Sequence, residues 1–202
     1  MAWIDYKKAF DSVPHTWILR CLELYKINGK LIQFLSNQMT TWKTDMTLAH
    51  NNGEITIQDV RINRGIYQGD SLSPLIFCLT LDPLSKIIKD QNIGYNVGKV
   101  RGQDANKEII SHLLFMDDIK LFADSDENLQ KLIQTLHDYS NDIHMEFGLD
   151  KCAKCTIKTG KKMETDGFEL QDGSIIEDLQ EDASYKYICF EENTNIQHKK
   201  MR

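Results

Sequence analysis

The sequence is poor in the features that mark secreted, membrane-spanning or disordered proteins. Of its 202 residues, only three are proline and five are cysteine. No apolar run approaches the ~20 residues of a membrane-spanning helix, and no secretory signal opens the chain. Hydrophobic residues make up 41% and charged residues 27%, which is typical of a folded domain with a core. We therefore expect an intracellular domain, in the cytoplasm or the nucleus, with no membrane partner.

The cysteines are few and scattered. They lie at Cys21, Cys78, Cys152, Cys155 and Cys189. An odd and dispersed set suits a reducing compartment rather than a disulfide framework. Only Cys152 and Cys155 are closely spaced, whereas a structural zinc site usually takes four ligands from two such pairs. Two ordinary thiols at the start of a strand are therefore favoured over zinc.

Positive charge is also scarce, because 30 acidic residues outnumber 24 basic ones and the net charge is −6. Neutralisation of phosphates by lysine and arginine provides much of the affinity of nucleic-acid-binding proteins. The charge balance therefore counts against a stand-alone nucleic-acid-binding module. It is compatible with a catalytic segment whose basic surfaces lie elsewhere.

Apolar periodicity and turn residues divide the chain into strands and helices. Helical spacing predicts helices over residues 14–27, 30–40, 75–89 and 126–147. Strands are expected at 2–5, 152–158 and 185–190, hairpins at 46–60, 109–123 and 168–176, and a loop or weak hairpin at 90–106. This order predicts an α+β fold with helices packed on one face of an antiparallel sheet.

Residues that favour helix ends set the expected boundaries. Asp11 or Ser12 is placed to cap the first predicted helix, and Asn28 with Gly29 to close it. For Asp11, this capping role is favoured over a role as a metal ligand. Asp124 opens a capping box before the last predicted helix, and Gly148 is expected to end that helix.

Two adjacent aspartates, Asp117 and Asp118, interrupt the apolar run over residues 111–123. Read as strand, turn and strand, this run is a hairpin with two carboxylates at its tip. One interpretation is an ordinary polar turn. The other is a functional site, because a carboxylate in so apolar a segment is usually paired or bound to a metal.

Five short segments give the strongest functional signal. They are residues 5–11, 64–74, 115–118, 148–154 and 185–189. In this order they resemble motifs A to E of the palm of a reverse transcriptase, specifically of the non-LTR or LINE-type retrotransposon family. The first keeps the motif A pattern D-x-x-x-A-F-D and the third keeps the motif C box F/Y-x-D-D, whereas Cys189 stands where motif E usually has glycine.

The resemblance implies a reverse-transcriptase-like palm over residues 1–190, with the fingers and thumb largely missing. It leaves residues 191–202 as a basic tail that we expect to be disordered. The implied function is RNA-directed DNA polymerisation, in which a nucleotide is transferred to a primer 3′-hydroxyl. The implied partners are an RNA template, a DNA primer and deoxynucleoside triphosphates, while the oligomeric state is not indicated.

The resemblance also implies a metal site. Asp5 and Asp117 correspond to the acids that bridge two Mg²⁺ ions, for which Mn²⁺ can substitute, and Asp118 corresponds to the second acid of motif C. The backbone oxygen of Tyr6 is a further candidate ligand. Two metal ions lie roughly 3.5–4 Å apart in such sites, so we expect Asp5 and Asp117 on neighbouring strands with carboxylates about 4–6 Å apart.

Four further residues correspond to nucleotide-binding positions of the family, and each has a plainer interpretation. Phe10 lies at the steric gate that excludes a ribose 2′-hydroxyl, or else it is a core aromatic. Gln68 and Gly69 correspond to residues that touch the incoming nucleotide and the template, or else they form a turn before a helix. Lys154 corresponds to the motif D lysine that can protonate pyrophosphate, or else it is a solvated lysine.

Two hypotheses of function follow. The first is an RNA-directed DNA polymerase palm with the acids Asp5, Asp117 and Asp118 intact. The second is a non-catalytic remnant of a truncated retrotransposon, which the missing fingers and thumb and the acidic charge favour. Another palm-fold enzyme, such as a nucleotide cyclase, has no counterpart of motif B.

Overall fold

The computed structural model describes residues 1–50, 53–97, 108–180, 183–188 and 190–192. Within it the chain forms two compact units. Residues 1–7 and 82–202 form the palm-sheet unit, and residues 8–81 form the hairpin unit. The predictions made for Cys189 and for the tail beyond residue 192 lie outside the described residues.

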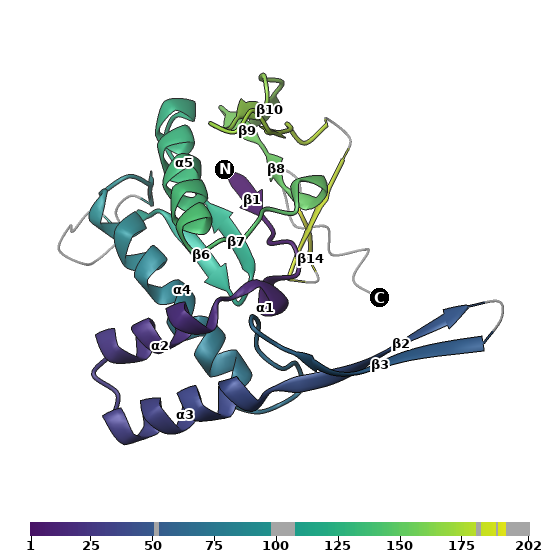
Figure 1. The fold of residues 1–202 in the computed structure, drawn as a ribbon. Coiled ribbons are helices and arrows are strands. Elements are labelled where there is room, and N and C mark those ends of the chain that lie inside the picture. The colour runs from purple at the N-terminus through teal and green to yellow at the C-terminus, as the bar shows by residue number, and fades with distance from the viewer. Residues whose placement is uncertain (51–52, 98–107, 181–182, 189, 193–202) are drawn as a thin grey trace. The chain divides into compact units, whose positions relative to one another are not determined.

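The palm-sheet unit is built on a four-stranded antiparallel sheet with the strand order β6-β7-β1-β8. Its strands are β1 (Ala2–Ile4), β6 (His112–Phe115), β7 (Asp118–Leu121) and β8 (Ala153–Lys154). Helix α5 (Asp126–Asp142) lies across β6 and β7 in Figure 1, and its apolar stripe is buried. The expected α+β architecture, with helices packed on an antiparallel sheet, is confirmed.

The opposite face of this sheet is covered by the C-terminal hairpin. The hairpin consists of β13 (Tyr185–Tyr187) and β14 (Phe190–Glu192). The single strand predicted over residues 185–190 is therefore wrong, because Ile188 adopts φ 45° and the chain reverses there. Trp3 stacks on Tyr185 with ring centroids 4.9 Å apart, and its register partner Lys120 forms a buried ion pair with Glu192.

Helix α5 ends five residues earlier than the apolar pattern predicts. His144 adopts φ 55°, and the amide of Met145 donates to the carbonyl of Ser140 at 2.8 Å, which closes the helix. Gly148 therefore does not end α5. At the other end Ser125, rather than Asp124, is the N-cap, and it accepts a hydrogen bond from the amide of Asn128.

Short elements complete the palm-sheet unit. They are β4 (Tyr95–Asn96), β5 (Ile109–Ile110), the 3-10 helix η1 (Leu149–Lys151), β9 (Thr156–Lys158), β10 (Lys161–Met163), β11 (Phe168–Glu169) and β12 (Ile175–Ile176). β4 pairs with β5, so the second strand of this hairpin lies beyond the predicted range 90–106 and takes Ile109 and Ile110 from the predicted Asp-Asp hairpin. The predicted strand over residues 152–158 is split between β8 and β9 at Cys155.

The hairpin unit contains three helices and a long hairpin. They are α1 (Ala9–Ser12), α2 (His15–Leu24), α3 (Gly29–Thr41), β2 (Lys43–His50) and β3 (Gly53–Arg61). In Figure 1 the β2–β3 hairpin extends as an arm from the end of α3. Helix α4 (Ser73–Asp90) begins in this unit and continues through Pro83.

The ends of α2 differ from the prediction. Its N-cap is Pro14, with no side-chain cap from Asp11 or Ser12. At its C-terminus Lys26 takes the left-handed conformation with φ 55°, a position that usually favours glycine. Gly29 is instead the first residue of α3. No helix in the described part of the chain is both long and apolar enough to cross a membrane.

Candidate active site

The two motif C aspartates lie at the tip of the β6–β7 hairpin, as predicted. Phe115 pairs with Asp118, so Met116 and Asp117 form the two-residue turn between the strands. Met116 has φ 54°, which suits the tight turn that joins two antiparallel strands. Asp117 therefore projects from the turn, and Asp118 is the first residue of β7.

Asp5 reaches the same end of the sheet from β1. Ile4 pairs with Ile119, so the next register position brings Asp5 opposite Asp118. Burial raises the pKa of Asp118, and the negative charges of Asp117 and then Asp5 raise it further, against the positive charge of Lys151. The fold thus gathers the three acids, which are far apart in the sequence, into one acidic cluster.

A lysine that the sequence interpretation did not select faces this cluster. The ammonium of Lys151, at the end of η1, lies 3.2 Å from Oδ2 of Asp5. The hydrogen bond to Asp5 and its charge raise the pKa of Lys151, with a smaller contribution from Asp117. The spacing Gly148-Leu149-x-Lys151 within the motif D segment was the available signal for this residue.

Lys154, the lysine chosen from the sequence, lies in a buried polar cluster of its own. Its side chain is 3% exposed, so it is not a solvated lysine. Its ammonium donates to Thr165 Oγ1 and to the carbonyl of Asp166, each at 3.0 Å. Carboxylate oxygens of Asp126 and Asp178 lie 3.8 Å away. These contacts give Lys154 a structural role between β8 and the segments that follow it.

Gly148 makes room for the Asp5 carboxylate. Its amide donates to the carbonyl of Asp5 at 2.8 Å, which ties the η1 segment to the end of β1. A Cβ at position 148 would lie 3.1 Å from Oδ2 of Asp5, closer than most Cβ contacts in proteins. The motif D glycine is therefore needed for close packing against a motif A acid, not for ending a helix.

The side chain of Tyr6 packs into the core directly after Asp5. Its hydroxyl lies 2.8 Å from the hydroxyl of Ser140 on α5. Its ring meets Phe147 edge to face with centroids 5.8 Å apart. These contacts fix the backbone directly after Asp5.

The three nucleotide-binding candidates of motifs A and B lie in the hairpin unit. Phe10 is half-buried, and its ring stacks on Phe77 of α4 with centroids 4.5 Å apart. Gln68 and Gly69 are exposed. Gly69 has φ +104° and no protein atom within 4 Å of an added Cβ, so the backbone conformation, not a close protein neighbour, requires glycine there.

The kinds of side chain available as ligands determine which metal ions the palm-sheet unit could bind. Across the described ranges, no three His, Cys, Asp or Glu side chains lie close enough to hold a metal ion, so Asp5, Asp117 and Asp118 influence one another's charge without forming a closed metal site. Cys152 and Cys155 are buried free thiols. Burial raises the pKa of the Cys152 thiol to about 11. The acids Asp5, Asp117 and Asp118 offer hard oxygen donors. Such donors fit Mg²⁺, which proteins usually bind through one or two carboxylates together with substrate phosphates.

Comparisons with known proteins identify the family. Residues 1–191 match the family model described as "Reverse transcriptase (RNA-dependent DNA polymerase)". The chain is 30% identical over 156 residues to a "Retrovirus-related Pol polyprotein from type-1 retrotransposable element R2" of Popillia japonica, which covers 77% of this chain and 24% of that protein. It is 29% identical over 192 residues to the polyprotein of type-2 element R2DM of Drosophila melanogaster, covering 93% and 17%.

Solved structures show the same fold. A telomerase from Candida tropicalis superposes with a TM-score of 0.57 at 10% identity, covering 97% of this chain and 34% of that chain. A telomerase from Candida albicans superposes with a TM-score of 0.51 at 11% identity, covering 100% and 30%. At these identities the similarity concerns the fold.

The chain therefore belongs to the reverse transcriptase family. The sequence prediction of a reverse transcriptase domain of the non-LTR type is confirmed. The chain spans about a fifth of the length of the curated R2 relatives it matches.

Proposed function

We propose that residues 1–190 form the palm of an RNA-directed DNA polymerase and that Asp5, Asp117 and Asp118 are its catalytic acids. The single observation that carries this proposal is the strand register, in which Ile4 pairs with Ile119 and Phe115 with Asp118. Asp5, the residue after Ile4, therefore comes to the end of the sheet where Asp118 follows the turn that holds Asp117. The raised pKa of Asp118, which burial raises most and the charges of Asp117 and Asp5 raise further, supports it. Adjacent carboxylates repel one another, and cations relieve that repulsion.

Asp5, Asp117 and Asp118 would hold two Mg²⁺ ions, or Mn²⁺ ions in their place. When bound, such ions activate the primer 3′-hydroxyl and stabilise charge on the leaving pyrophosphate. The backbone oxygen of Tyr6, held by the buried tyrosine side chain, is a further candidate ligand. The ammonium of Lys151 pairs with Asp5 and therefore lies beside the acids, where it could contact a substrate phosphate.

Lys151 is therefore our candidate for the acid that protonates pyrophosphate. Its ammonium is exposed and faces the acids, whereas the ammonium of Lys154 is buried among partners of its own. Phe10 is our candidate for the gate against a ribose 2′-hydroxyl. The exposed Gln68 and the adjacent Gly69 are candidates for contacts to the nucleotide and template.

The corresponding partners are an RNA template, a DNA primer and deoxynucleoside triphosphates. Polymerisation on these partners would place the chain in the cytoplasm or the nucleus. The similarity to R2 polyproteins and to telomerases supports a nucleic-acid substrate. The resemblance of the motif residues to those of reverse transcriptases supports deoxynucleoside triphosphates as the second substrate.

Binding of Mn²⁺ with a non-hydrolysable deoxynucleotide, followed by electron paramagnetic resonance, tests the assignment of the acids. We expect Asp117→Asn and Asp5→Asn to weaken Mn²⁺-nucleotide binding by about tenfold or more, because each removes a charged oxygen donor. The matched control Asp150→Asn changes an acid that neighbours Lys151 in sequence and should leave binding unchanged. Equal binding by all of these variants would refute the metal site.

A further inference from the structure

Three aromatic rings from separate segments of the hairpin unit lie in contact. His15, at the start of α2, meets the ring of Trp42 edge-on with centroids 5.2 Å apart. Trp42, the C-cap of α3, lies against Tyr67 with centroids 4.7 Å apart and an interplanar angle of 56°. The chain thus places a supported tyrosine one residue before Gln68.

The backbone that presents Tyr67 is held firmly. The amide of Gly65 donates to the carbonyl of Val13, and the amide of Ile66 donates to the carbonyl of Phe10, each at 2.8 Å. Gly65 has φ +85° and packs so closely on Asp11 that a Cβ would lie 2.8 Å from its backbone. Although Gly65 and Ile66 are buried, Tyr67 itself is 41% exposed. A rigid segment therefore presents an aromatic ring to solvent.

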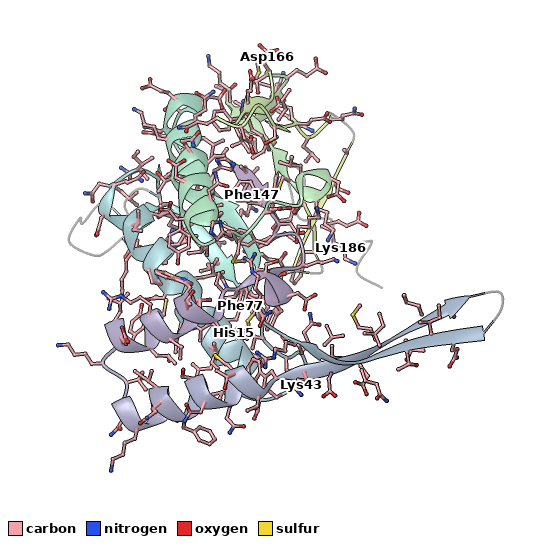
Figure 2. The ribbon with its side chains drawn as sticks, in the orientation of Figure 1. His15, Lys43, Phe77, Phe147, Asp166 and Lys186 are labelled. Atoms are coloured by element: carbon pink, nitrogen blue, oxygen red, sulfur yellow. The ribbon has the colours of Figure 1, made fainter. Side chains whose placement is uncertain are left out.

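Basic residues cluster at the base of the hairpin, next to these rings. Lys43 pairs with Arg61 at the first rung of the hairpin, directly after Trp42, and Figure 2 shows Lys43 where α3 gives way to β2. Lys43 forms an ion pair with Asp59 at 2.9 Å, so its charge is compensated locally. Arg61 is exposed, and within the described residues no hydrogen bond or ion pair engages its guanidinium. Arg61 is therefore a cation available to a phosphate.

We propose that Tyr67, supported by Trp42, is a stacking platform for one unpaired base of a nucleic-acid strand, with Arg61 as a cation for a neighbouring phosphate. Exposed aromatic rings beside basic side chains are the usual means of binding single strands without sequence preference. The proposal rests on the proposed function and deepens it, because it names the residue that receives the strand next to Gln68. The shared ligand chemistry is an unpaired nucleobase, from either a template RNA or a DNA strand.

Fluorescence anisotropy of the 202-residue chain with a labelled 12-nucleotide single-stranded RNA tests the platform. We expect Tyr67→Ala and Tyr67→Leu to weaken binding about fivefold or more, because a base stacked on an aromatic ring contributes substantially to such affinities. Tyr67→Phe keeps the ring and should bind within about twofold of the original chain. The matched control is Tyr95→Ala, which removes a 56% exposed tyrosine from the palm-sheet unit and should leave binding unchanged.

A strand with abasic sites separates stacking from other effects of the substitution. Tyr67→Ala should no longer weaken binding when the ligand has no bases to stack. A DNA strand of the same sequence identifies the source of the base. If Tyr67→Ala weakens binding of RNA only, the platform receives the template. If it weakens binding of both RNA and DNA, the platform receives any single strand. Equal binding of RNA by Tyr67→Ala and the original chain, or an undiminished loss with the abasic strand, would overturn the proposal.

The result can be separated from that of the polymerase proposal. Unchanged RNA binding by Tyr67→Ala would refute the platform while leaving the acids in place. Loss of Mn²⁺-nucleotide binding by Asp117→Asn does not depend on Tyr67.

Discussion

The ammonium of Lys151 lies 3.2 Å from a carboxylate oxygen of Asp5, and this pair joins motif D to motif A at the candidate active site. Asp5 is the first residue after β1, and Lys151 ends η1. The same segment is tied to Asp5 by the amide of Gly148 and to the C-terminal hairpin by Tyr185, whose hydroxyl donates to the carbonyl of Lys151 at 2.6 Å. Motifs A, D and E are therefore connected through one residue.

The first prediction distinguishes the two lysines of motif D. In a chimera in which residues 1–191 replace the matching segment of an R2 relative, Lys151→Met should lower the rate of primer extension about 100-fold or more, because general acid catalysis contributes effects of this size. Its free energy of unfolding should change little, since the Lys151 side chain is exposed.

Lys154→Met should show the opposite pattern. It removes the cation between the carboxylates of Asp126 and Asp178, and loss of one partner from a buried charge cluster costs about 3 kcal/mol. Denaturant unfolding of both variants, measured beside extension rates, checks the assignment. A stable Lys154→Met chain with the larger loss of rate would return the acid role to Lys154.

The second prediction concerns the room that Gly148 leaves for Asp5. Gly148→Ala places a methyl group about 3 Å from the Asp5 carboxylate and should lower extension about tenfold or more, because small displacements of reacting groups are costly. Gly148 has φ −81°, a value that alanine also adopts, so the substitution should change the free energy of unfolding by less than about 1 kcal/mol. Gly29→Ala, at a position with open space around it, is the control and should leave the rate unaltered.

The third prediction concerns Phe10. Phe10→Ala should admit ribonucleotides in the chimera, because the bulky ring would no longer block a 2′-hydroxyl, while Phe10→Tyr should keep discrimination. The ring also stacks on Phe77, so Phe10→Ala should cost about 1–2 kcal/mol of stability. Competition between ribonucleotides and deoxynucleotides in primer extension measures the sugar selectivity of each variant. Lost stability with unchanged sugar selection would leave Phe10 as a core aromatic only.

The fourth prediction concerns the pH dependence of stability at the start of α4. Asp70 accepts hydrogen bonds from the amides of Leu72 and Ser73 and from the Ser73 hydroxyl, and these bonds lower its pKa, the hydroxyl most. A carboxyl with a lowered folded-state pKa stabilises the fold above its unfolded pKa and loses that contribution as pH falls through the folded value.

Asp70→Ala should therefore cost about 1 kcal/mol at pH 7, as loss of a helix-capping side chain does. The difference between variant and original chain should shrink as pH falls below the ordinary range of an aspartate pKa, where the carboxyl becomes protonated. Urea unfolding at several pH values measures it. A difference that is the same at pH 7 and at low pH would show that the carboxylate charge does not contribute.

Local patterns predicted much of the palm. The β6–β7 hairpin and its acids could be predicted because alternation and turn chemistry are local, and the motifs named the family. The ends of α2 and α5 could not, since Lys26 and His144 take left-handed conformations that glycine would normally signal. The choice between Lys151 and Lys154 also lay beyond the sequence, because it depends on which lysine the fold turns toward Asp5.

The most direct test of the central claim is primer extension on an RNA template with deoxynucleotides and Mg²⁺. The 202 residues alone should extend little, because polymerisation requires a firmly positioned duplex. The R2 chimera should extend the primer, and Asp117→Asn should abolish that extension. Robust extension by the Asp117→Asn chimera, or none by the chimera with all three acids intact, would contradict the account.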